Sequence, residues 1–389
     1  MQPNDTMIVS AGSVRGVIIV SPGGLHGRGG MGSVTREMAR WFAKASPQTK
    51  VAVVDPRGSG PALLWPLRLT LAVVQIVFIA LLHRPQVMHL QVSRRSSFIR
   101  KGVLLGLGKA LGMRVVLHHH GSEFASFFAE ASPRMKAWVR WVIFGAHANI
   151  VLGEKARAYL VEVVGVGDRQ VLVRANAIAD VLDKAGTTRA ADPWNLVFIA
   201  NLLPRKGIET LLQAISQLVA QGEPVRLTLV GDGDIDRYRQ MARALKIEDR
   251  CRFTGWVDGK SVQAHLATHG VLVLPSLHEG MPMAILEALA AGLPIVTTPV
   301  GAIPELLVHQ HTCLFVNPED VNELSKALTR LCRDTDLRAR LGANGRRLYE
   351  DRLEIGAYMA EMVLLYNALL ESTHQRRPGF NWSRRPNAE

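Results

Sequence analysis

Short apolar runs alternate with longer segments of helical periodicity along most of the chain. In the first half the short runs, which are typical of buried strands, occupy residues 15–22, 49–55, 86–92, 114–119, 147–153 and 171–175. Segments with apolar residues at helical spacing separate them, at 31–41, 69–82, 102–111, 138–146 and 154–163. The second half repeats the pattern from residue 195 onwards, with strand-like runs at 195–201, 225–230, 252–254, 271–274, 294–297 and 312–316. This alternation predicts an α/β fold with parallel sheets covered by helices.

The alternation stops once, at residues 176–193, which carry Asp, Gly and Thr without a periodic pattern. A length of 389 residues also favours two or three domains. We therefore expect one domain at 1–180 and another at 181–360. A C-terminal helix at 361–373 is expected to return to the first domain, and the basic residues 374–389 are expected to be a disordered tail. The long helical pattern at 337–370 predicts a break near Gly345 and Gly356.

Residues 270–306 contain the most informative stretch, a strand, a turn, a helix and a second strand. Pro282 stands where a helix can begin, and Gly292 with Pro294 ends it. Two carboxylates, Glu279 in the turn and Glu287 on the helix, are eight positions apart, or about 12 Å at helical rise. This separation exceeds the roughly 5–9.5 Å of glycosidase acid/base pairs. It suits two acceptors that hold opposite ends of a long polyhydroxy ligand.

A second turn, after the strand at 195–201, carries Arg205, Lys206 and Gly207 before another helix. Two cations beside a helix N-terminus form a strong site for a diphosphate, although exposed cations without a role are also common. With the two carboxylates, these cations point to a nucleotide-sugar and to group transfer. Nearby, Asp232 and Asp234 have the spacing of a divalent-metal pair, but a Gly/Asp turn that caps the next helix explains them as well, and we favour the cap.

Glycines follow the first predicted strand as SPGGLHGRGGMG. Gly27, Gly29 and Gly32 match G-x-G-x-x-G, and Asp55 lies at the distance of a dinucleotide-binding fingerprint, which would indicate an NAD-dependent dehydrogenase. However, six residues separate Val20 from Gly27, whereas the fingerprint places its first glycine directly after the strand. A glycine loop that offers backbone N–H groups to an anion is our interpretation, and a flexible connector is the alternative.

The most apolar segment, residues 61–82, raises the question of a membrane span. Pro66 and Arg68 interrupt it and leave 14 residues, fewer than the roughly 20 that a spanning helix needs. We predict a helix buried in the protein core. The basic stretch SRRSSFIRK that follows at residues 93–101 is either a phosphate-binding helix entrance or a solvated face.

Three consecutive histidines end the strand predicted at 114–119. In a strand, His118 and His120 face one side and His119 the other, so the three do not easily converge on one metal ion. A polar residue at the carboxyl end of a strand is well placed to meet a substrate, and we assign His120 to the site.

The net charge of +13 lies entirely in the first half: residues 1–180 hold 22 Lys and Arg against 9 Asp and Glu, and the rest is balanced. A basic half suggests an anionic membrane surface or a polyanionic partner, or a basic proteome without a specific partner. Nucleic acid is not expected, because no binding motif accompanies the charge. Three scattered cysteines indicate a reducing compartment, and residues 1–13 lack the features of a signal peptide.

The stretch HEGMPMAILEALAAGLPIVTTPVGAIPEL resembles the signature of family 4 retaining glycosyltransferases, and the similarity extends to residues 201–207, 231–233, the glycine loop and His120. The resemblance implies the GT-B fold, with two facing Rossmann-like domains and a cleft between them. It implies that Arg205 and Lys206 bind the donor diphosphate, Glu287 the ribose and Glu279 the transferred sugar. Gly231, Gly280 and Met281 would also contact the donor, Gly29 and Gly30 would contact phosphate or acceptor, and His120 would lie at the reacting face. No metal or other cofactor is implied.

The sequence thus predicts a metal-independent, retaining hexosyltransferase with His120 and Glu279 as catalytic residues. The expected partners are a UDP- or GDP-sugar, a lipid-linked glycan acceptor and the anionic inner face of the cytoplasmic membrane. The stretches HLQVSRRSSFIRK, at residues 89–101, and HHHGSEF further resemble bacterial exopolysaccharide and capsule assembly members. A nucleotide-sugar 2-epimerase of the same fold, the dehydrogenase and a non-catalytic sugar-nucleotide sensor remain as alternatives.

Overall fold

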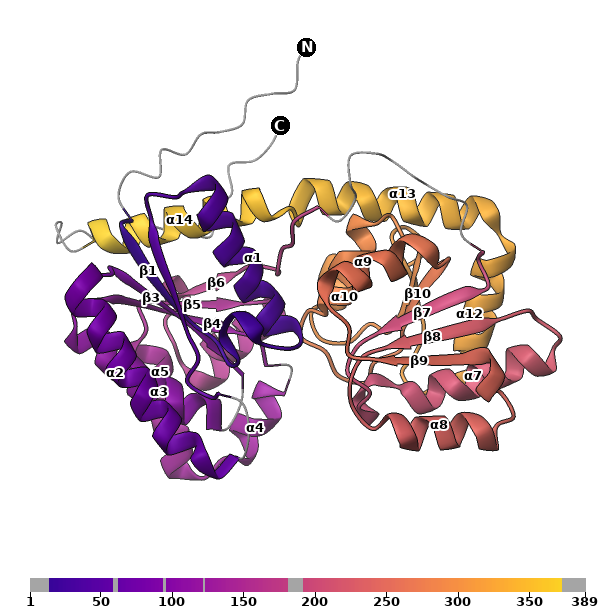
Figure 1. The fold of residues 1–389 in the computed structure, drawn as a ribbon, viewed down its shortest axis with the longest axis horizontal. Helices are drawn as coiled ribbons and strands as arrows, with labels where there is room; N and C mark the ends of the chain where they lie inside the picture. The colour runs from indigo at the N-terminus through magenta and orange to yellow at the C-terminus, as the bar shows by residue number, and fades with distance from the viewer. Residues whose placement is uncertain (1–13, 59–61, 94–95, 122, 181–191, 373–389) are drawn as a thin grey trace, which may run out of the picture. The chain divides into compact units, whose positions relative to one another are not determined.

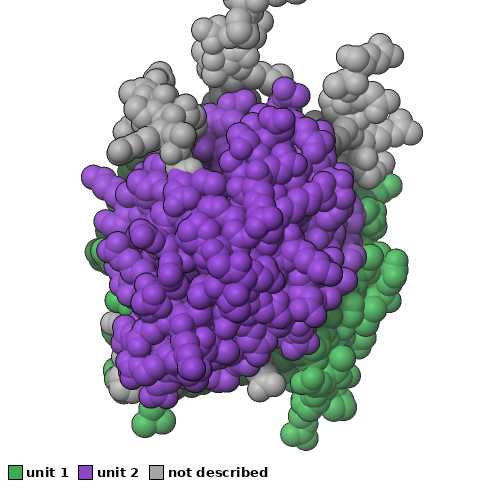
Figure 2. Space-filling view, turned by 90° about the vertical axis from the view of Figure 1, so that its right-hand side faces the viewer, with its two compact units in different colours: residues 1–151, 156–174, 355–389 green, residues 152–155, 175–354 purple. Residues whose placement is uncertain are grey.

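The structure, a computed structural model, describes residues 14–58, 62–93, 96–121, 123–180 and 192–372. The chain divides into two compact units, coloured separately in Figure 2. The first comprises residues 1–151, 156–174 and 355–389, and the second comprises 152–155 and 175–354. The divisions therefore fall at 174 and 354, where the sequence suggested 180 and 360. The predicted tail at 374–389 and most of the predicted linker lie outside the described residues.

The first unit is a six-stranded parallel sheet in the order β2-β1-β3-β4-β5-β6 (Figure 1). Its strands are β1 Gly16–Val20, β2 Lys50–Val54, β3 Val87–Val92, β4 Arg114–His119, β5 Ala148–Val151 and β6 Val171–Val173. Its α-helices are α1 Gly30–Ala45, α2 Trp65–His83, α3 Ser96–Ala110, α4 Phe124–Glu130, α5 Pro133–Gly145, α6 Glu154–Ala158, which begins in the second unit, and α14 Ile355–Glu371. Short 3-10 and π segments are η1 Gly24–His26, η2 Ala62–Leu64, η3 Tyr159–Val164 and η4 Asp168–Gln170.

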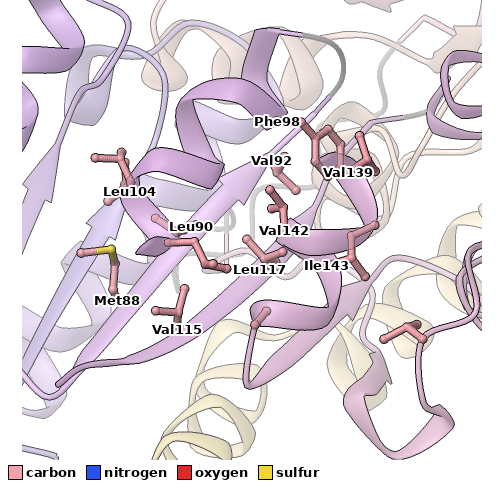
Figure 3. Packing of buried hydrophobic residues seen from close by; sticks show 14 of the residues in the cluster. Met88, Leu90, Val92, Phe98, Leu104, Val115, Leu117, Val139, Val142 and Ile143 are labelled. Atoms are coloured by element: carbon pink, nitrogen blue, oxygen red, sulfur yellow. The ribbon is translucent and has the colours of Figure 1, made fainter. Parts of the chain in front are cut away.

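Helices cover both faces of this sheet. Helices α2, α3 and α5 lie along one face, and α1 packs with α14 on the other (Figure 1). Figure 3 shows the core on the first of these faces, where alternate residues of β3 and β4 meet α3 and α5. The labelled side chains are Met88, Leu90, Val92, Phe98, Leu104, Val115, Leu117, Val139, Val142 and Ile143. Period-2 alternation thus puts one apolar stripe of each central strand into the core.

Helix α2 corrects the prediction of a buried helix. Its side chains Leu69, Ala72 and Ile76 are buried, but most of its other apolar residues are not. Leu67, Leu71, Val74, Phe78 and Leu81 are each between 58% and 72% exposed. Among the described residues, α2 is also the one helix long and apolar enough, by length and composition alone, to cross a membrane. Its sequence is apolar on both faces, so periodicity could not reveal that only one face is covered.

The second unit is also a six-stranded parallel sheet, in the order β12-β11-β10-β7-β8-β9. Its strands are β7 Asn195–Ile199, β8 Arg226–Val230, β9 Cys251–Gly255, β10 Val271–Leu274, β11 Ile295–Thr297 and β12 Leu314–Phe315. Its helices are α7 Ile208–Ala220, α8 Ile235–Ala244, α9 Gly259–Thr268, α10 Met283–Ala290, α11 Ile303–Leu306, α12 Val321–Arg333 and α13 Thr335–Arg352, with 3-10 turns η5 Pro204–Lys206 and η6 Glu248–Arg250. The order matches the Rossmann order in which the sheet reverses beside its first strand.

Gly345 does not break the helix that contains it. Helix α13 runs through it to Arg352, and the chain leaves helical geometry only before α14. A Cβ atom at Gly345 would lie 2.9 Å from a Leu289 methyl group, and one at Gly342 would lie 2.4 Å from the Gly292 carbonyl oxygen. These glycines allow α13 to approach α10 closely, so the residue taken as a helix breaker is a packing residue.

Each sheet has a topological switch point, where the direction of strand succession reverses. In the first unit it lies between β1 and β3, and in the second between β7 and β10. Ligands of open α/β sheets bind outside the carboxyl ends of the strands at such points. The loops that follow these four strands are therefore the places to search for a site.

Candidate functional site

The second unit brings two predicted site segments together at its switch point. The turn η5 follows β7 and holds Arg205 and Lys206, and the loop after β10 holds Glu279. Leu277 N–H donates to the Arg205 carbonyl oxygen at 2.8 Å, and the Arg205 guanidinium donates to the His278 carbonyl at 3.3 Å. The two loops are thus fastened to one another at the expected edge of the sheet.

A buried ion pair lies at the centre of this arrangement. Lys206 Nζ is 2.5 Å from Glu279 Oε1, and the two side chains are 10% and 6% exposed. Ser276 Oγ donates to the same carboxylate oxygen at 2.7 Å, and Thr298 Oγ1 donates to the Ser276 carbonyl at 2.5 Å. Glu279 is therefore held in one orientation by a cation and a hydroxyl group.

Burial sets the electrostatics of Lys206. Removal from water lowers its pKa below the usual 10.5, the Glu279 carboxylate opposes that shift, and Arg205 adds to it. A lysine whose charge is desolvated in this way interacts more strongly with any anion brought beside it than an exposed lysine would. The pair can accordingly hold a ligand that carries both an anionic group and hydroxyl groups.

Glycines make the close approach of these loops sterically feasible. Gly207 has φ +69°, and a Cβ atom there would lie 1.9 Å from the Pro275 carbonyl oxygen. Gly301 has φ +61°, and a Cβ atom would lie 2.0 Å from the Glu279 carbonyl oxygen. Side chains other than hydrogen would force both loops apart. The sequence reasoning did not assign Ser276 or Gly301 to the site; a hydroxyl three residues before Glu279 and a glycine after the next strand were the available signals.

Gly280 and Met281 lie in the loop before α10, and Glu287 lies in the middle of that helix. The Gly280 carbonyl accepts from Ala302 N–H at 3.0 Å, the Met281 side chain is buried, and Pro282 caps the helix. The estimate of about 12 Å between the two carboxylates assumed helical rise along the whole interval from Glu279 to Glu287. That assumption is wrong, because α10 begins only at Met283 and half of the interval is a loop. Their roles as two ends of a ligand clamp remain a prediction.

Gly231 follows β8, the strand next to β7. It has φ +151°, and a Cβ atom there would lie 1.9 Å from the Ala200 carbonyl oxygen. The carboxylates beside it serve the backbone: Asp232 accepts from Gly233 N–H at 3.0 Å, and Asp234 caps α8 by accepting from Arg237 N–H at 3.3 Å. The prediction of a helix cap at Asp234 is confirmed.

The glycine loop of the first unit joins β1 to α1. Gly29, with φ +80°, is the N-cap of α1, and a Cβ atom there would meet nothing within 4 Å. Gly27 and Gly32 are needed for packing, because a Cβ atom at Gly32 would lie 2.0 Å from the Gly27 carbonyl oxygen. Gly29 and the exposed Gly30 thus leave the N–H groups at the helix start open to an anion.

His120, which is partly exposed, ends a row of polar rings in the first unit whose other members are buried. Tyr366 hydroxyl lies 2.8 Å from His89 Nδ1, His89 Nε2 lies 3.3 Å from His118 Nδ1, and the rings of His118 and His120 are 4.0 Å apart. His119 points to the opposite face, where its Nε2 lies 3.0 Å from Asn149 Oδ1, as strand geometry predicts. Burial, with the neighbouring imidazoles, lowers the pKa of His120 to about 3. His120 is therefore neutral near pH 7, and its Nε2 has no hydrogen-bond partner within the described part of the chain.

The structure thus groups the ten predicted site residues by unit. Six lie around the second switch point or at α10, namely Arg205, Lys206, Glu279, Gly280, Met281 and Glu287, and Gly231 follows the adjacent strand. Gly29, Gly30 and His120 follow β1 and β4 of the first unit. A separate cavity of about 690 Å³ lies at the amino ends of β7, β8 and β9, the opposite edge of that sheet, and includes no predicted site residue.

The fold and the switch-point site define a class of protein, and comparison with known families agrees. Residues 193–334 match the family described as "Glycosyl transferases group 1". Residues 193–334 are therefore similar to a group 1 glycosyltransferase domain, and the two Rossmann-like units have the sheets of the GT-B fold. The resemblance to these glycosyltransferases is confirmed.

Similar curated proteins include a GDP-mannose-dependent α-(1-6)-phosphatidylinositol monomannoside mannosyltransferase from Mycobacterium tuberculosis, 31% identical over 41% of this chain and 43% of the relative. The amylovoran biosynthesis glycosyltransferase AmsK from Erwinia amylovora is 26% identical over 59% of this chain and 55% of its own length. The chain thus spans about half the length of these relatives. Exopolysaccharide enzymes are therefore among its homologues.

Solved structures show the fold over nearly the whole chain. A sucrose-phosphate synthase from Thermosynechococcus elongatus has a TM-score of 0.78 at 20% identity, and the match covers 92% of this chain and 100% of that one. Anabaena HepE in complex with UDP-glucose has a TM-score of 0.68 at 17% identity, with 91% and 99% covered. At these identities the likeness concerns the fold alone.

Proposed function

We propose that the protein is a retaining glycosyltransferase that moves a sugar from a nucleotide-sugar to a lipid-linked glycan in bacterial surface polysaccharide biosynthesis. The observation that carries the proposal is the buried Lys206–Glu279 pair at the switch point of a group 1 glycosyltransferase domain. The exopolysaccharide enzymes among the relatives support the pathway.

In this proposal the donor lies along the carboxyl edge of the second sheet. Arg205, Lys206 and the N-terminus of α7 hold the diphosphate, because cations and open N–H groups together favour an anion. Glu287 holds the ribose and Glu279 a hydroxyl group of the sugar. Gly231, Gly280 and Met281 border the donor through their backbone. HepE was crystallised with UDP and UDP-glucose, and the mycobacterial relative is named for GDP-mannose, so a UDP- or GDP-sugar is the donor class.

The chemistry follows from stabilisation of the departing diphosphate. Preorganised cations and helix N-termini act on the charge that develops there, without a covalent enzyme nucleophile. A metal-independent reaction is supported by the use of Asp232 and Asp234 in turn and cap hydrogen bonds. His120, neutral near pH 7, offers a hydrogen bond to the reacting sugar, and Gly29 with Gly30 contacts donor phosphate or acceptor.

Helix α2 supports association with the inner face of the cytoplasmic membrane. Its exposed apolar residues Leu67, Leu71, Val74, Phe78 and Leu81 recur every three or four positions and so form one stripe. Its opposite face is packed on the protein through Leu69, Ala72 and Ile76, which suits a helix that lies in a membrane surface better than one that spans. Residues 56–122 carry nine Arg and Lys and no Asp or Glu, so anionic lipid is the complementary partner.

Vesicle flotation tests this surface. The chain is expected to float with vesicles that contain anionic phospholipid, and Leu71→Glu/Phe78→Glu should reduce the bound fraction at least roughly tenfold, because two apolar contacts become repelled charges. Leu364→Glu, on an exposed apolar position of α14, is the matched control and should bind as the wild type does. Equal binding of all three proteins would refute the surface.

Thermal-shift screening with nucleoside diphosphates and nucleotide-sugars tests the donor site. One nucleotide class should raise Tm selectively, and Lys206→Met should abolish that rise. Transfer to a prenyl-diphosphate glycan, with the anomeric configuration of the product read by NMR, then tests the reaction. Unchanged transfer by both Lys206→Met and Glu279→Ala, or no stabilisation by any nucleotide, would overturn the proposal.

The same experiments separate the alternatives. A 2-epimerase would convert its nucleotide-sugar without an acceptor, and a sensor would bind donor without releasing nucleoside diphosphate. A dehydrogenase would bind a nicotinamide cofactor. Against it, the turn η1 separates β1 from Gly27, and the glycines Gly27 and Gly32 are explained by packing against each other.

A further inference from the structure

Two buried cations of the first unit take no part in the function described above. Lys101 and Arg100 lie on α3, the helix that follows β3 at the switch point, and are 1% and 8% exposed. Lys101 Nζ and Arg100 Nε have no hydrogen-bond partner among the residues that the structure describes. A buried charge without a partner is expensive, and an apolar side chain at either position would cost less.

The direction of these side chains follows from the helix period. The buried stripe of α3 includes Ser97, Lys101, Leu104 and Gly108, so Lys101 faces the sheet. Arg100 and Gly102 lie on opposite flanks of that stripe at about 100° per residue. A Cβ atom at Gly102 would strike Trp138 and Val142 of α5, so Arg100 is on the other flank, towards α2.

A third cation belongs to the same cluster. Arg57, which follows β2, is exposed, and its charge lowers the pKa of Arg100 after the larger effect of burial. Burial and then Arg100 lower the pKa of Lys101 to about 7. Asp55 counters both shifts in part, but its Oδ1 accepts from the Arg57 backbone N–H at 2.8 Å in a tight turn. Three cations therefore share one nearby carboxylate, and one oxygen of that carboxylate already accepts a backbone hydrogen bond.

The position of the cluster points to a ligand. It lies beside the carboxyl ends of β2 and β3, next to the glycine loop: a Cβ atom at Gly24 would be 3.6 Å from Asp55 Cβ. The first turns of α2 are tied to it, since the Arg68 guanidinium donates to the Arg57 carbonyl at 3.1 Å. The cations thus adjoin the helix whose outer stripe is apolar and exposed.

We propose that Arg57, Arg100 and Lys101 form a subsite for the phosphate or diphosphate of a lipid, beside the exposed apolar helix α2. Arg57 is the exposed entrance, and the buried cations form the end of the subsite. A doubly charged phosphate group would supply the acceptors that the buried N–H groups lack. The identification of this lipid as the acceptor rests on the proposed function. The binding site itself would exist whether or not the protein transfers a sugar.

Thermal-shift titration with inorganic pyrophosphate and with geranyl diphosphate tests the subsite, in buffer saturated with the nucleoside diphosphate that raises Tm most, so that the donor site is occupied. The wild type should be stabilised further by geranyl diphosphate. Lys101→Met and Arg57→Gln should each lose at least roughly tenfold in affinity for it, while their response to the nucleotide stays unchanged. Lys44→Met, an exposed lysine of α1, is the matched control and should behave as the wild type does.

The variants also separate the possible results. Lys101→Met should fold, with a raised Tm in the absence of ligand, because it removes a buried charge, and Arg57→Gln changes an exposed side chain. Equal affinity for pyrophosphate and geranyl diphosphate would assign the subsite to free phosphate chemistry rather than to a lipid and overturn that part of the inference. Undiminished binding by both variants, or no binding beyond the nucleotide, would overturn the subsite and leave the proposed function intact. Failure of every nucleotide to bind would instead overturn the proposed function.

Discussion

The Lys206–Glu279 pair should cost far more to break than to remove. With Nζ and Oε1 2.5 Å apart and the side chains 10% and 6% exposed, each single change leaves one charge buried. Lys206→Met and Glu279→Gln should each lower the free energy of unfolding by about 3–5 kcal/mol. The double variant leaves no charge behind, so its loss should be smaller than that of either single variant and less than half of the sum of the two.

The pH dependence separates the two single variants. Burial already holds the pKa of Lys206 below 10.5, and Glu279 opposes that shift, so Glu279→Gln should lower the pKa further. Between that value and 10.5 the unfolded chain binds the proton and the folded chain does not, so stability rises with pH. The deficit of Glu279→Gln should therefore shrink as the pH approaches 10. The deficit of Lys206→Met should not shrink in this way, since it has no lysine to titrate.

Urea unfolding followed by far-UV circular dichroism is the assay, fitted with separate transitions because the chain has two units. The exposed pair Arg237–Glu209, at 2.6 Å with side chains 52% and 46% exposed, is the matched control. Arg237→Met should cost less than about 1 kcal/mol. Strict additivity of the Lys206 and Glu279 changes, or a loss as small as that of the control, would refute the buried pair.

Three further changes are predicted. Lys101→Met should raise the free energy of unfolding by at most about 5 kcal/mol, because burial lowers the pKa of Lys101 from 10.5 to about 7. This gain should be full below pH 7 and should vanish as the pH nears 10.5, so equal gains in urea unfolding at pH 6 and pH 10 would contradict the prediction. Gly207→Ala should lower the free energy of unfolding by at least about 3 kcal/mol, because its Cβ atom would lie 1.9 Å from a backbone carbonyl oxygen. The control Gly222→Ala has φ +82° and nothing within 4 Å of the new Cβ atom, so it should cost about 1 kcal/mol in the same assay. Tyr366→Phe should lower the free energy of unfolding by about 1–2 kcal/mol, because the lost hydroxyl group is hydrogen-bonded to the buried His89 imidazole at 2.8 Å. Tyr358→Phe should leave stability unchanged, because its buried hydroxyl group has no partner in the described part of the chain. Similar calorimetric Tm values for the two variants would contradict this prediction.

The sequence was sufficient for the strands and for the site loops, for one physical reason. Parallel strands buried on both faces are short, continuous apolar runs, and the turns after them carry polar residues that a core cannot hold. The spacing of Lys206 after β7 and Glu279 after β10 then places both at one edge of the sheet once the strand order is known. Ser276 escaped notice because a serine gains its role only from the carboxylate it contacts.

Two predictions from the sequence were wrong: that helix α2 is buried, and that Gly345 breaks the helix that contains it. Helix α2 is apolar on both faces, so composition predicts burial, and only the neighbouring elements reveal that one face is left open. Gly345 reads as a breaker, but the close approach of α13 to α10 requires it. Both facts depend on packing between segments far apart in sequence, which a local pattern does not contain.

Each unit buries a lysine after a strand that borders its switch point, and the two lysines differ in their partners. Lys206 follows a strand that borders one switch point and has Glu279 as its partner, while Lys101 follows a strand that borders the other and has no hydrogen-bond partner among the described residues. A paired lysine keeps its charge and shares it with a ligand that brings its own hydroxyl groups. An unpaired lysine whose pKa is near 7 gains most from a ligand that brings full negative charge. This difference fits the two proposed ligands: a diphosphate with its sugar beside Lys206 in the second unit, and the phosphate group of a lipid beside Lys101 in the first.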